Sequence, residues 1–181
     1  MTKNTRKVFD LTIAGEEDSP AAYAECIRIA RRLRTPGYAP IGLVPAPGVE
    51  VEPVAMRLAA ALVDLSAQPT ALVYALARSA RRRGSIRWLR PALAVITPEA
   101  AVHAAGKAAA ARAAIARAGD SFRHILVDLS GLEALGELQS VLRSVQRIAV
   151  VASARATRET EVLALARSLP APKQLGVMLV G

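Results

Sequence analysis

The segment PAPGVEVEP, residues 45–53, has an order that could do nucleotide chemistry, because an apolar run precedes it and a helical pattern follows. Proteins that bind nucleotides place a loop of the form G-x-x-x-x-G-K-[ST] at such a junction. Its glycines let backbone N–H groups approach the phosphates, its lysine neutralises them and its hydroxyl holds Mg²⁺. Aligned on the following helix, Gly48 takes an inner glycine position. Glu50 then replaces the last glycine, Val51 the lysine and Glu52 the Ser or Thr.

These replacements oppose the binding of a phosphate-rich ligand. Glu50 and Glu52 add negative charge, and each like-charge contact at about 4 Å costs on the order of 4 kcal/mol at an effective dielectric constant of about 20. Pro53 removes an N–H donor from the start of the helix, where anions bind. The sequence therefore predicts that the loop does not bind a nucleotide in the ordinary way, and we expect no cofactor.

Two further apolar runs end at positions with possible metal chemistry. Residues 70–79, TALVYALARS, carry Tyr74 and Leu76 where related nucleotide enzymes carry the acids of a D-x-D motif. Residues 124–131, HILVDLSG, keep Asp128 at the end of the run. Asp128 either coordinates Mg²⁺ or caps the turn that follows its strand.

Cysteine and histidine chemistry has little support. Cys26 is the only cysteine, so no internal disulfide or cysteine metal cluster can form, and we interpret it as a small buried apolar residue. His103 and His124 lie far apart without ligand spacing, and we interpret them as a surface and a strand histidine. We therefore expect no metal site and no Ser/His/Asp or Cys/His arrangement.

Composition points to a single domain with a basic surface. The chain has 181 residues, of which 52% are hydrophobic and 3% aromatic, so the core must be built from Ala, Val, Leu and Ile. The formal net charge of +9 favours acidic partners: nucleic acid, an anionic membrane face or an acidic protein patch. No apolar stretch reaches the roughly 18 residues of a membrane span, and the N-terminus does not resemble a signal peptide, so we expect a cytoplasmic protein.

Short apolar runs alternate along the chain with longer Ala-rich helical patterns. The apolar runs lack in/out alternation, which is typical of parallel strands covered on both faces. They lie at residues 41–45, 70–75, 92–97, 124–129, 147–153 and 175–180. The helical patterns lie at residues 19–34, 53–66, 99–118, 133–144 and 156–168, with Pro98 and Glu99 expected at the start of the third. The alternation predicts a three-layer α/β domain with a mainly parallel sheet and helices on both faces.

The predicted sheet also indicates where a ligand would bind. Open parallel sheets hold ligands beyond the carboxyl ends of their strands. The candidate site therefore gathers residues 45–53, 74–79, 128–131 and 152–156. Residues 1–18 are polar and irregular, and we interpret them as a flexible N-terminal arm with a short extended piece, followed by a single domain over residues 19–181.

The densest basic segment is RSARRRGSIRWLR, residues 78–90. It is either a solvated connection or a docking patch for an acidic partner. In the second interpretation Arg81, Arg82 and Arg83 supply the charge, and Trp88 supplies an apolar anchor.

The assembled pattern resembles the bacterial tyrosine kinases of capsule and exopolysaccharide synthesis, which are deviant P-loop ATPases related to chromosome-partition and septum-placement proteins. Residues 19–35, SPAAYAECIRIARRLRT, look like the first helix of that family, and residues 40–62 look like its loop and following helix. Residues 122–131, FRHILVDLSG, are similar to its second acidic motif, and residues 155–181 to its terminal helix and strand. The resemblance implies a P-loop NTPase-like fold over residues 19–181.

The first helix of the kinases carries E-x-x-R-x-x-R, which serves self-association, and Glu25, Arg28 and Arg31 match it. Positions i, i+3 and i+6 follow one side of a helix, so these side chains can pair with a complementary row on a second copy. The alternative is an intrahelical pair between Glu25 and Arg28. The helical pattern directs three apolar residues towards the sheet: Ile27, Ala30 and Leu33.

The resemblance and the altered motifs together imply a pseudoenzyme, a catalytically inactive kinase-like scaffold or regulatory protein. The chain also reaches Gly181 without the tyrosine-rich tail that the kinases phosphorylate. By resemblance, its partners are a second copy of itself and a membrane-anchored chain-length or co-polymerase protein of polysaccharide export, which places it at the inner face of the membrane. Two alternatives remain: a weak nucleotide-binding sensor that relies on Gly48 and Asp128, and a positioning or partition-type adaptor that contacts DNA or membrane. Nucleic acid is not the expected partner under the first interpretation.

Overall fold

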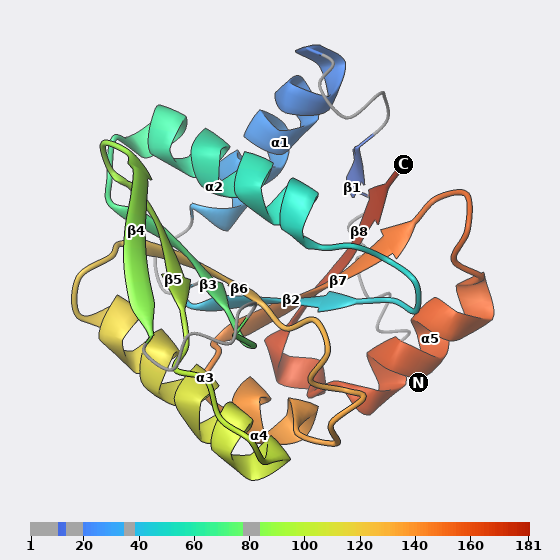
Figure 1. The fold of residues 1–181 in the computed structure, drawn as a ribbon. Helices are drawn as coiled ribbons and strands as arrows, with labels where there is room; N and C mark the ends of the chain where they lie inside the picture. The colour runs from blue at the N-terminus through green and yellow to red at the C-terminus, as the bar shows by residue number, and fades with distance from the viewer. Residues whose placement is uncertain (1–10, 14–19, 35–38, 78–83) are drawn as a thin grey trace.

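The computed structural model describes residues 11–13, 20–34, 39–77 and 84–181. Within these ranges eight strands form one sheet in the order β1-β8-β7-β2-β6-β3-β5-β4 (Figure 1). Neighbouring strands run parallel except β4, which is antiparallel to β5. The prediction of a mainly parallel α/β sheet is confirmed.

The six predicted strands all form, with ends that differ from the expected ones by at most one residue. The strands are β1 (Leu11–Ile13), β2 (Ile41–Pro45), β3 (Thr70–Tyr74), β4 (Ser85–Arg90), β5 (Leu93–Thr97), β6 (His124–Asp128), β7 (Arg147–Ser153) and β8 (Gln174–Val180). The helices are α1 (Pro20–Leu33), α2 (Glu52–Ser66), α3 (Ala104–Gly119), α4 (Leu138–Leu142) and α5 (Glu159–Ser168), with a 3₁₀ turn η1 (Ala171–Lys173).

The helices cover both faces of the sheet. Helices α1 and α2 lie on one face, and α3, α4 and α5 lie on the other (Figure 1). Successive side chains of a strand point to opposite faces, so in β2 the side chains of Ile41 and Leu43 pack under α1 and α2 while Val44 packs on the opposite side. Because both faces are dry, every position of such a strand is apolar, and this is why the runs lack alternation.

Three helices begin three or more residues later than their sequence patterns predicted, and the last of them, α5, begins at Glu159 and not at residue 156. Pro98 and Glu99 do not lie in the first turn of α3, because the chain leaves β5 at the sheet and first crosses to the helical layer before α3 begins at Ala104. The helix predicted from residue 133 begins at Leu138. Gly136 has φ +70°, a left-handed conformation that a right-handed helix cannot contain.

The buried face of α1 also differs from the expected one. Ala30 and Leu33 are buried as predicted, but Ile27 is only partly buried. Ile29 and Cys26 are fully buried in its place. A helix packed between a sheet and a neighbouring helix buries a wider stripe than a single i, i+3 row, and α1 packs against α2 as well as against the sheet.

The two outer strands of the sheet lie in segments that were not among the six predicted strands: residues 78–90, predicted as a solvated connection or a docking patch, and residues 1–18, where a short extended piece was expected. Half of the basic segment 78–90 is the edge strand β4, and Arg81, Arg82 and Arg83 lie outside the described residues. Six exposed residues in β4 give no buried face to reveal the strand, so periodicity could not identify it. Of residues 1–18 the structure describes only β1, which pairs in parallel with β8.

Gly42 is the second residue of β2, and two side chains of the core on the α3, α4 and α5 side pack against its backbone. A Cβ atom there would lie 2.7 Å from Leu129 Cδ1 and 3.3 Å from Val145 Cγ2, both in the buried core. We expect Gly42→Ala to lower the free energy of unfolding by about 1–3 kcal/mol. Gly119→Ala is the matched control, because a Cβ at that helix end meets nothing within 4 Å. Urea unfolding followed by circular dichroism measures both, and equal stability of the two variants would contradict this packing.

Candidate functional site

The candidate site lies at the carboxyl edge of the central strands β2, β6 and β3. Asp128 at the end of β6 lies opposite Leu43 of β2 and opposite Tyr74 of β3. The next residues continue the same connections, since Leu129 N–H donates to the Leu43 carbonyl at 3.0 Å and Ala75 N–H donates to the Asp128 carbonyl at 2.9 Å. The predicted gathering of these strand ends is therefore present, and residues 78 and 79 of the predicted set lie outside the described residues.

The loop after β2 closes into a tight β-turn. Val49 N–H donates to the Ala46 carbonyl at 3.1 Å, and Gly48 between them has φ +75°. Proline at the second position and a positive-φ glycine at the third are the signature of a type II turn, and Pro47 and Gly48 fill those positions. Ala46 N–H donates to the Val151 carbonyl of β7 at 2.7 Å. Two N–H groups of the loop thus bond to protein carbonyls, whereas a phosphate cradle directs such groups at its ligand.

Val51 turns inward at the start of α2. Its side chain is buried in the cluster that α1 and α2 form with the sheet. Helix α2 then begins with Glu52 and Pro53, so one of its first N–H donors is missing. The position that corresponds to the phosphate-binding lysine is therefore a core position, where an ammonium group would lose its hydration.

Glu52 and Tyr74 form a direct hydrogen bond across the site. The Tyr74 hydroxyl donates to Glu52 Oε1 at 2.5 Å, and the tyrosine is only 6% exposed. By resemblance these two positions correspond to the hydroxyl and an acid that would hold Mg²⁺. The sequence did not predict this contact, because the two residues are 22 positions apart and no pattern joins them.

Leu76, at the other altered acidic position, packs against the backbone after β6. A Cβ on Gly131 would lie 2.8 Å from Leu76 Cδ1, so only glycine lets this side chain approach so closely. Gly131 also has φ +80°, which favours glycine independently. Leu76 contributes to the core cluster below the site.

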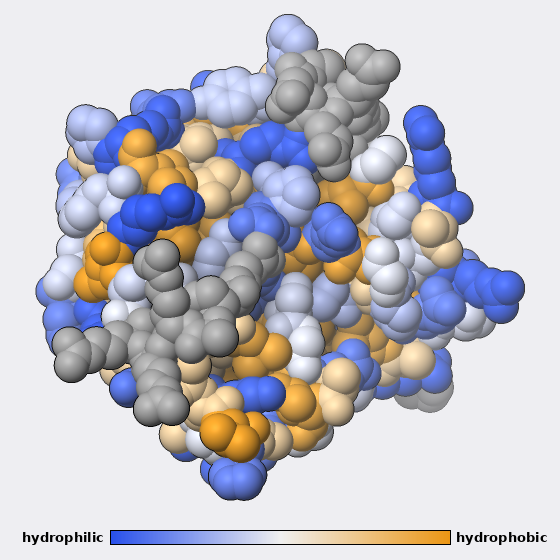
Figure 2. Space-filling model, viewed as in Figure 1, coloured by the Kyte–Doolittle hydropathy of each residue, from blue (hydrophilic) through white to orange (hydrophobic). Residues whose placement is uncertain are grey.

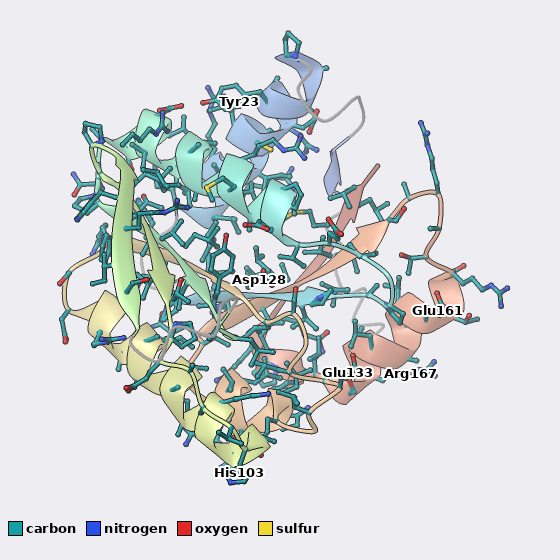
Figure 3. All side chains as sticks on the ribbon, in the orientation of Figure 1. Tyr23, His103, Asp128, Glu133, Glu161 and Arg167 are labelled. Atoms are coloured by element: carbon teal, nitrogen blue, oxygen red, sulfur yellow. The ribbon has the colours of Figure 1, made fainter. Side chains whose placement is uncertain are left out.

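Asp128 is buried and engaged in its own turn. Its Oδ1 accepts a hydrogen bond from Ser130 N–H at 2.9 Å and one from Ser130 Oγ at 2.5 Å. Figure 3 shows Asp128 in the interior at this sheet edge, with His103 far away at the start of α3. The turn-capping interpretation of Asp128 matches this geometry. Within the described ranges, no group of three or more His, Cys, Asp or Glu side chains is arranged to hold a metal ion.

The predicted row on α1 contains an intrahelical ion pair. Arg28 Nε lies 2.7 Å from Glu25 Oε2, and both side chains are partly exposed. Arg31 is exposed one turn further along the helix. The pair occupies Glu25 and Arg28 within one chain, as the alternative interpretation expected, and Arg31 remains on the accessible side of the helix.

A second network, not predicted, joins α1, α2 and β4. The Tyr23 hydroxyl donates to Asp64, and this hydrogen bond is the main reason that the pKa of Tyr23 is raised. Arg90 Nη2 lies 2.8 Å from Asp64 Oδ1 and donates to the Ala60 carbonyl at 2.7 Å. The first helix and the edge strand, both candidate interfaces, are therefore tied to the same carboxylate of α2.

The remaining predicted residues lie apart from the strand ends. Trp88 on β4 is 58% exposed, and its ring centroid lies 5.5 Å from that of Phe122. His103 is exposed, as expected for a surface histidine, and His124 is the first residue of β6, where burial lowers its pKa. Cys26 is buried, which raises the pKa of its thiol.

The fold is a P-loop NTPase-like α/β fold of the kind found in bacterial tyrosine kinase domains. The chain is similar to the kinase domain of the Escherichia coli tyrosine kinase ETK, with a TM-score of 0.69 and 18% identity over 89% of this chain and 73% of that one. It is similar to the chimerical protein CapA2B2, with a TM-score of 0.68 and 17% identity over 96% and 94%. The BceF tyrosine kinase domain gives a TM-score of 0.60 and 13% identity over 89% and 75%.

No protein-family model matches the sequence, and no curated protein matches it. The likeness therefore defines the fold. The described helices also include none with the length and apolar character to cross a bilayer.

The Tyr74–Glu52 hydrogen bond can be tested by a double-mutant cycle of Tyr74→Phe and Glu52→Gln. A buried hydroxyl that donates to a carboxylate stabilises by more than a neutral pair, so we expect Tyr74→Phe to lower the free energy of unfolding by about 1.5–3 kcal/mol. The double variant should lose less than the sum of the two, with a coupling of about 0.5–3 kcal/mol. Additive losses in urea unfolding would show that the two side chains do not interact in solution.

Proposed function

We propose that this protein is a kinase-like binding protein that does not transfer phosphoryl groups. The observation that carries the proposal is the hydrogen bond between Tyr74 and Glu52, at two positions that would hold Mg²⁺ in a working relative. A metal ion at this place needs oxygen ligands directed at it. In this chain the hydroxyl at one of the two positions donates a hydrogen bond to the carboxylate at the other.

Charge and backbone geometry support the same proposal. Glu50 is exposed at the loop and Glu52 lies at the helix start, so a triphosphate would approach carboxylates where it would otherwise meet a lysine. The type II turn at Gly48 and the proline in the first turn of α2 leave few N–H donors for an anion. The carboxylates, the type II turn and the proline affect different atoms of the site. Reversal of one of these changes therefore leaves the other two in place.

The binding role follows from what the sequence retains. By its resemblance to the capsule and exopolysaccharide kinases, the protein acts in a polysaccharide synthesis and export system, at the inner face of the membrane. Its partners are then a second copy of itself, through Glu25, Arg28 and Arg31, and a membrane-anchored chain-length or co-polymerase protein. A formal net charge of +9 suits an acidic protein segment or an anionic membrane surface.

The absence of nucleotide binding is testable by isothermal titration of the purified protein with ATP and Mg²⁺. We expect no saturable binding at nucleotide concentrations up to about 1 mM, a limit that corresponds to only about 4 kcal/mol of binding free energy. The variant with Val51→Lys and Glu52→Thr should show no ATP hydrolysis, because Tyr74 and Leu76 still replace the second acidic motif. Micromolar binding by the wild type, or turnover by the variant, would refute the proposal.

The proposed self-association is testable with the variant Arg28→Ala and Arg31→Ala. A charge left unpaired in a desolvated interface costs several kcal/mol, so the change should lower the assembly state or release the membrane partner. The fold should persist, because both side chains are at least partly exposed. Light scattering and a pull-down with the membrane protein provide the measurements.

A matched control removes the same charge elsewhere, with Arg155→Ala and Arg167→Ala at exposed positions near and on α5. This variant should assemble and bind as the wild type does. If all three proteins behave alike, the row on α1 is only a solvated helix face. Steep salt-dependent binding to DNA would instead favour a partition-type adaptor.

A further inference from the structure

Strand β4 is an open edge of the sheet with apolar side chains on its surface. All six of its residues are exposed, and β5 is its only neighbour among the described strands. Ile86, Trp88 and Leu89 are 51%, 58% and 41% exposed, and they account for half of the six exposed large apolar residues in the described part of the chain. Native proteins normally shorten, twist or charge such an edge because it can pair with another strand.

The backbone of β4 has a free side. In an antiparallel pair, alternate residues direct their N–H and C=O groups to the neighbouring strand, and the residues between them direct theirs away from it. The register with β5 runs from Ser85 opposite Thr97 to Arg90 opposite Leu93, with one irregularity between Trp88 and Arg90. Half of the backbone groups of β4 therefore point away from the sheet, available to a further strand.

Arginines are the main charges around this edge, and Glu99, which lines the same hollow as Gly84 and Arg117, is an acidic side chain among them. Arg87 on β4 is exposed, Arg123 is exposed beside Phe122, and Arg117 Nη2 reaches within 3.2 Å of the Cβ position of Gly84. Figure 2 shows strongly polar and apolar residues intermixed on the left of the view, where Figure 1 draws β4. Arg90 forms an ion pair with Asp64 of α2, so this arginine holds β4 against α2 and its charge is partly neutralised within the chain.

We infer that β4 binds an extended, acidic segment of a partner protein as an added strand. Main-chain hydrogen bonds to the outer side of β4 supply affinity, while alternate side chains of the segment contact Ile86 and Trp88 or meet the surrounding arginines. The ring of Trp88 is held against Phe122, so it presents an ordered apolar surface. The inference deepens the proposed binding role and rests on it.

The observations favour this occupant over two others. Pairing of β4 with β4 of a second copy would bring Arg87 and Arg123 of each copy close together, and this local repulsion of like charges opposes it. An anionic membrane would satisfy the charge and the tryptophan, but it offers no regular row of donors and acceptors to an open strand edge. An acidic strand satisfies the charge, the apolar side chains and the backbone groups together.

The test selects peptides of about twelve residues from a random display library against the full chain, then measures their affinities by fluorescence anisotropy. We expect selected peptides to alternate acidic and apolar residues. The variant Ile86→Thr with Trp88→Thr keeps strand-forming residues and should bind the best peptide at least about tenfold more weakly. Val102→Thr with Leu163→Thr removes two exposed apolar residues away from β4 and should bind it unchanged.

N-methylation of the peptide tests the pairing itself. Methylation of every second backbone nitrogen should abolish binding in one register and leave it intact in the other, because only alternate N–H groups of an added strand face β4. Equal affinity of the two N-methylated peptides would overturn the inference. So would the lack of any selected binder, equal binding by the β4 variant, or helical binders.

Two further measurements identify the competing occupants. Loss of binding to phosphatidylcholine and phosphatidylserine vesicles in the β4 variant, with no effect on peptides, would assign the edge to the membrane. Loss of a dimer in light scattering by the same variant would assign it to a second copy. Nucleotide titration tests the carboxyl ends of the central strands and does not test β4. Micromolar nucleotide binding with unchanged peptide binding would therefore refute the proposed function without contradicting the peptide site on β4.

Discussion

The burial of the central strands on both faces is the constraint on which the rest of the structure depends. Strands β2, β6 and β3 have almost no exposed side chains, so each face of the sheet must be covered by helices. The covering helices are rich in alanine, and α3 buries Ala108, Ala111, Ala114 and Ala118 against the sheet. Small side chains let helix and sheet backbones approach closely, and the core reaches close packing with few aromatic residues. The same layering places every strand-to-helix connection at one of two sheet edges.

At the carboxyl edge, this arrangement brings together residues that would bind a ligand in a working nucleotide enzyme. In this chain they contact each other. Tyr74 donates to Glu52, Leu76 packs on Gly131, Asp128 accepts from Ser130, and Val51 enters the core. A hydrogen bond between two protein groups needs no ligand to satisfy it, whereas a metal-binding pair of oxygens does.

Helix α1 and strand β4 both contact one carboxylate of α2, that of Asp64. Asp64 accepts from Tyr23 of α1 and pairs with Arg90 of β4. A helix proposed for self-association and a strand proposed for partner binding thus share a contact on α2. The two contacts use different oxygens of the carboxylate, Oδ2 for Tyr23 and Oδ1 for Arg90, so both are formed together.

The sequence by itself determined the layers, the parallel strands and the strand ends that form the site, because doubly buried strands require continuous apolar runs. Only the tertiary structure decided the Tyr74–Glu52 hydrogen bond, because partners 22 positions apart leave no periodic signal. It also decided that Ser85–Arg90 forms an edge strand, since six exposed residues carry no in/out pattern. It decided as well that α4 starts after Gly136, since a helical pattern of apolar residues does not show which glycine takes a left-handed backbone. The local pattern of apolar residues determines which positions are buried. Contacts between residues far apart in the sequence determine which polar side chains bond to each other.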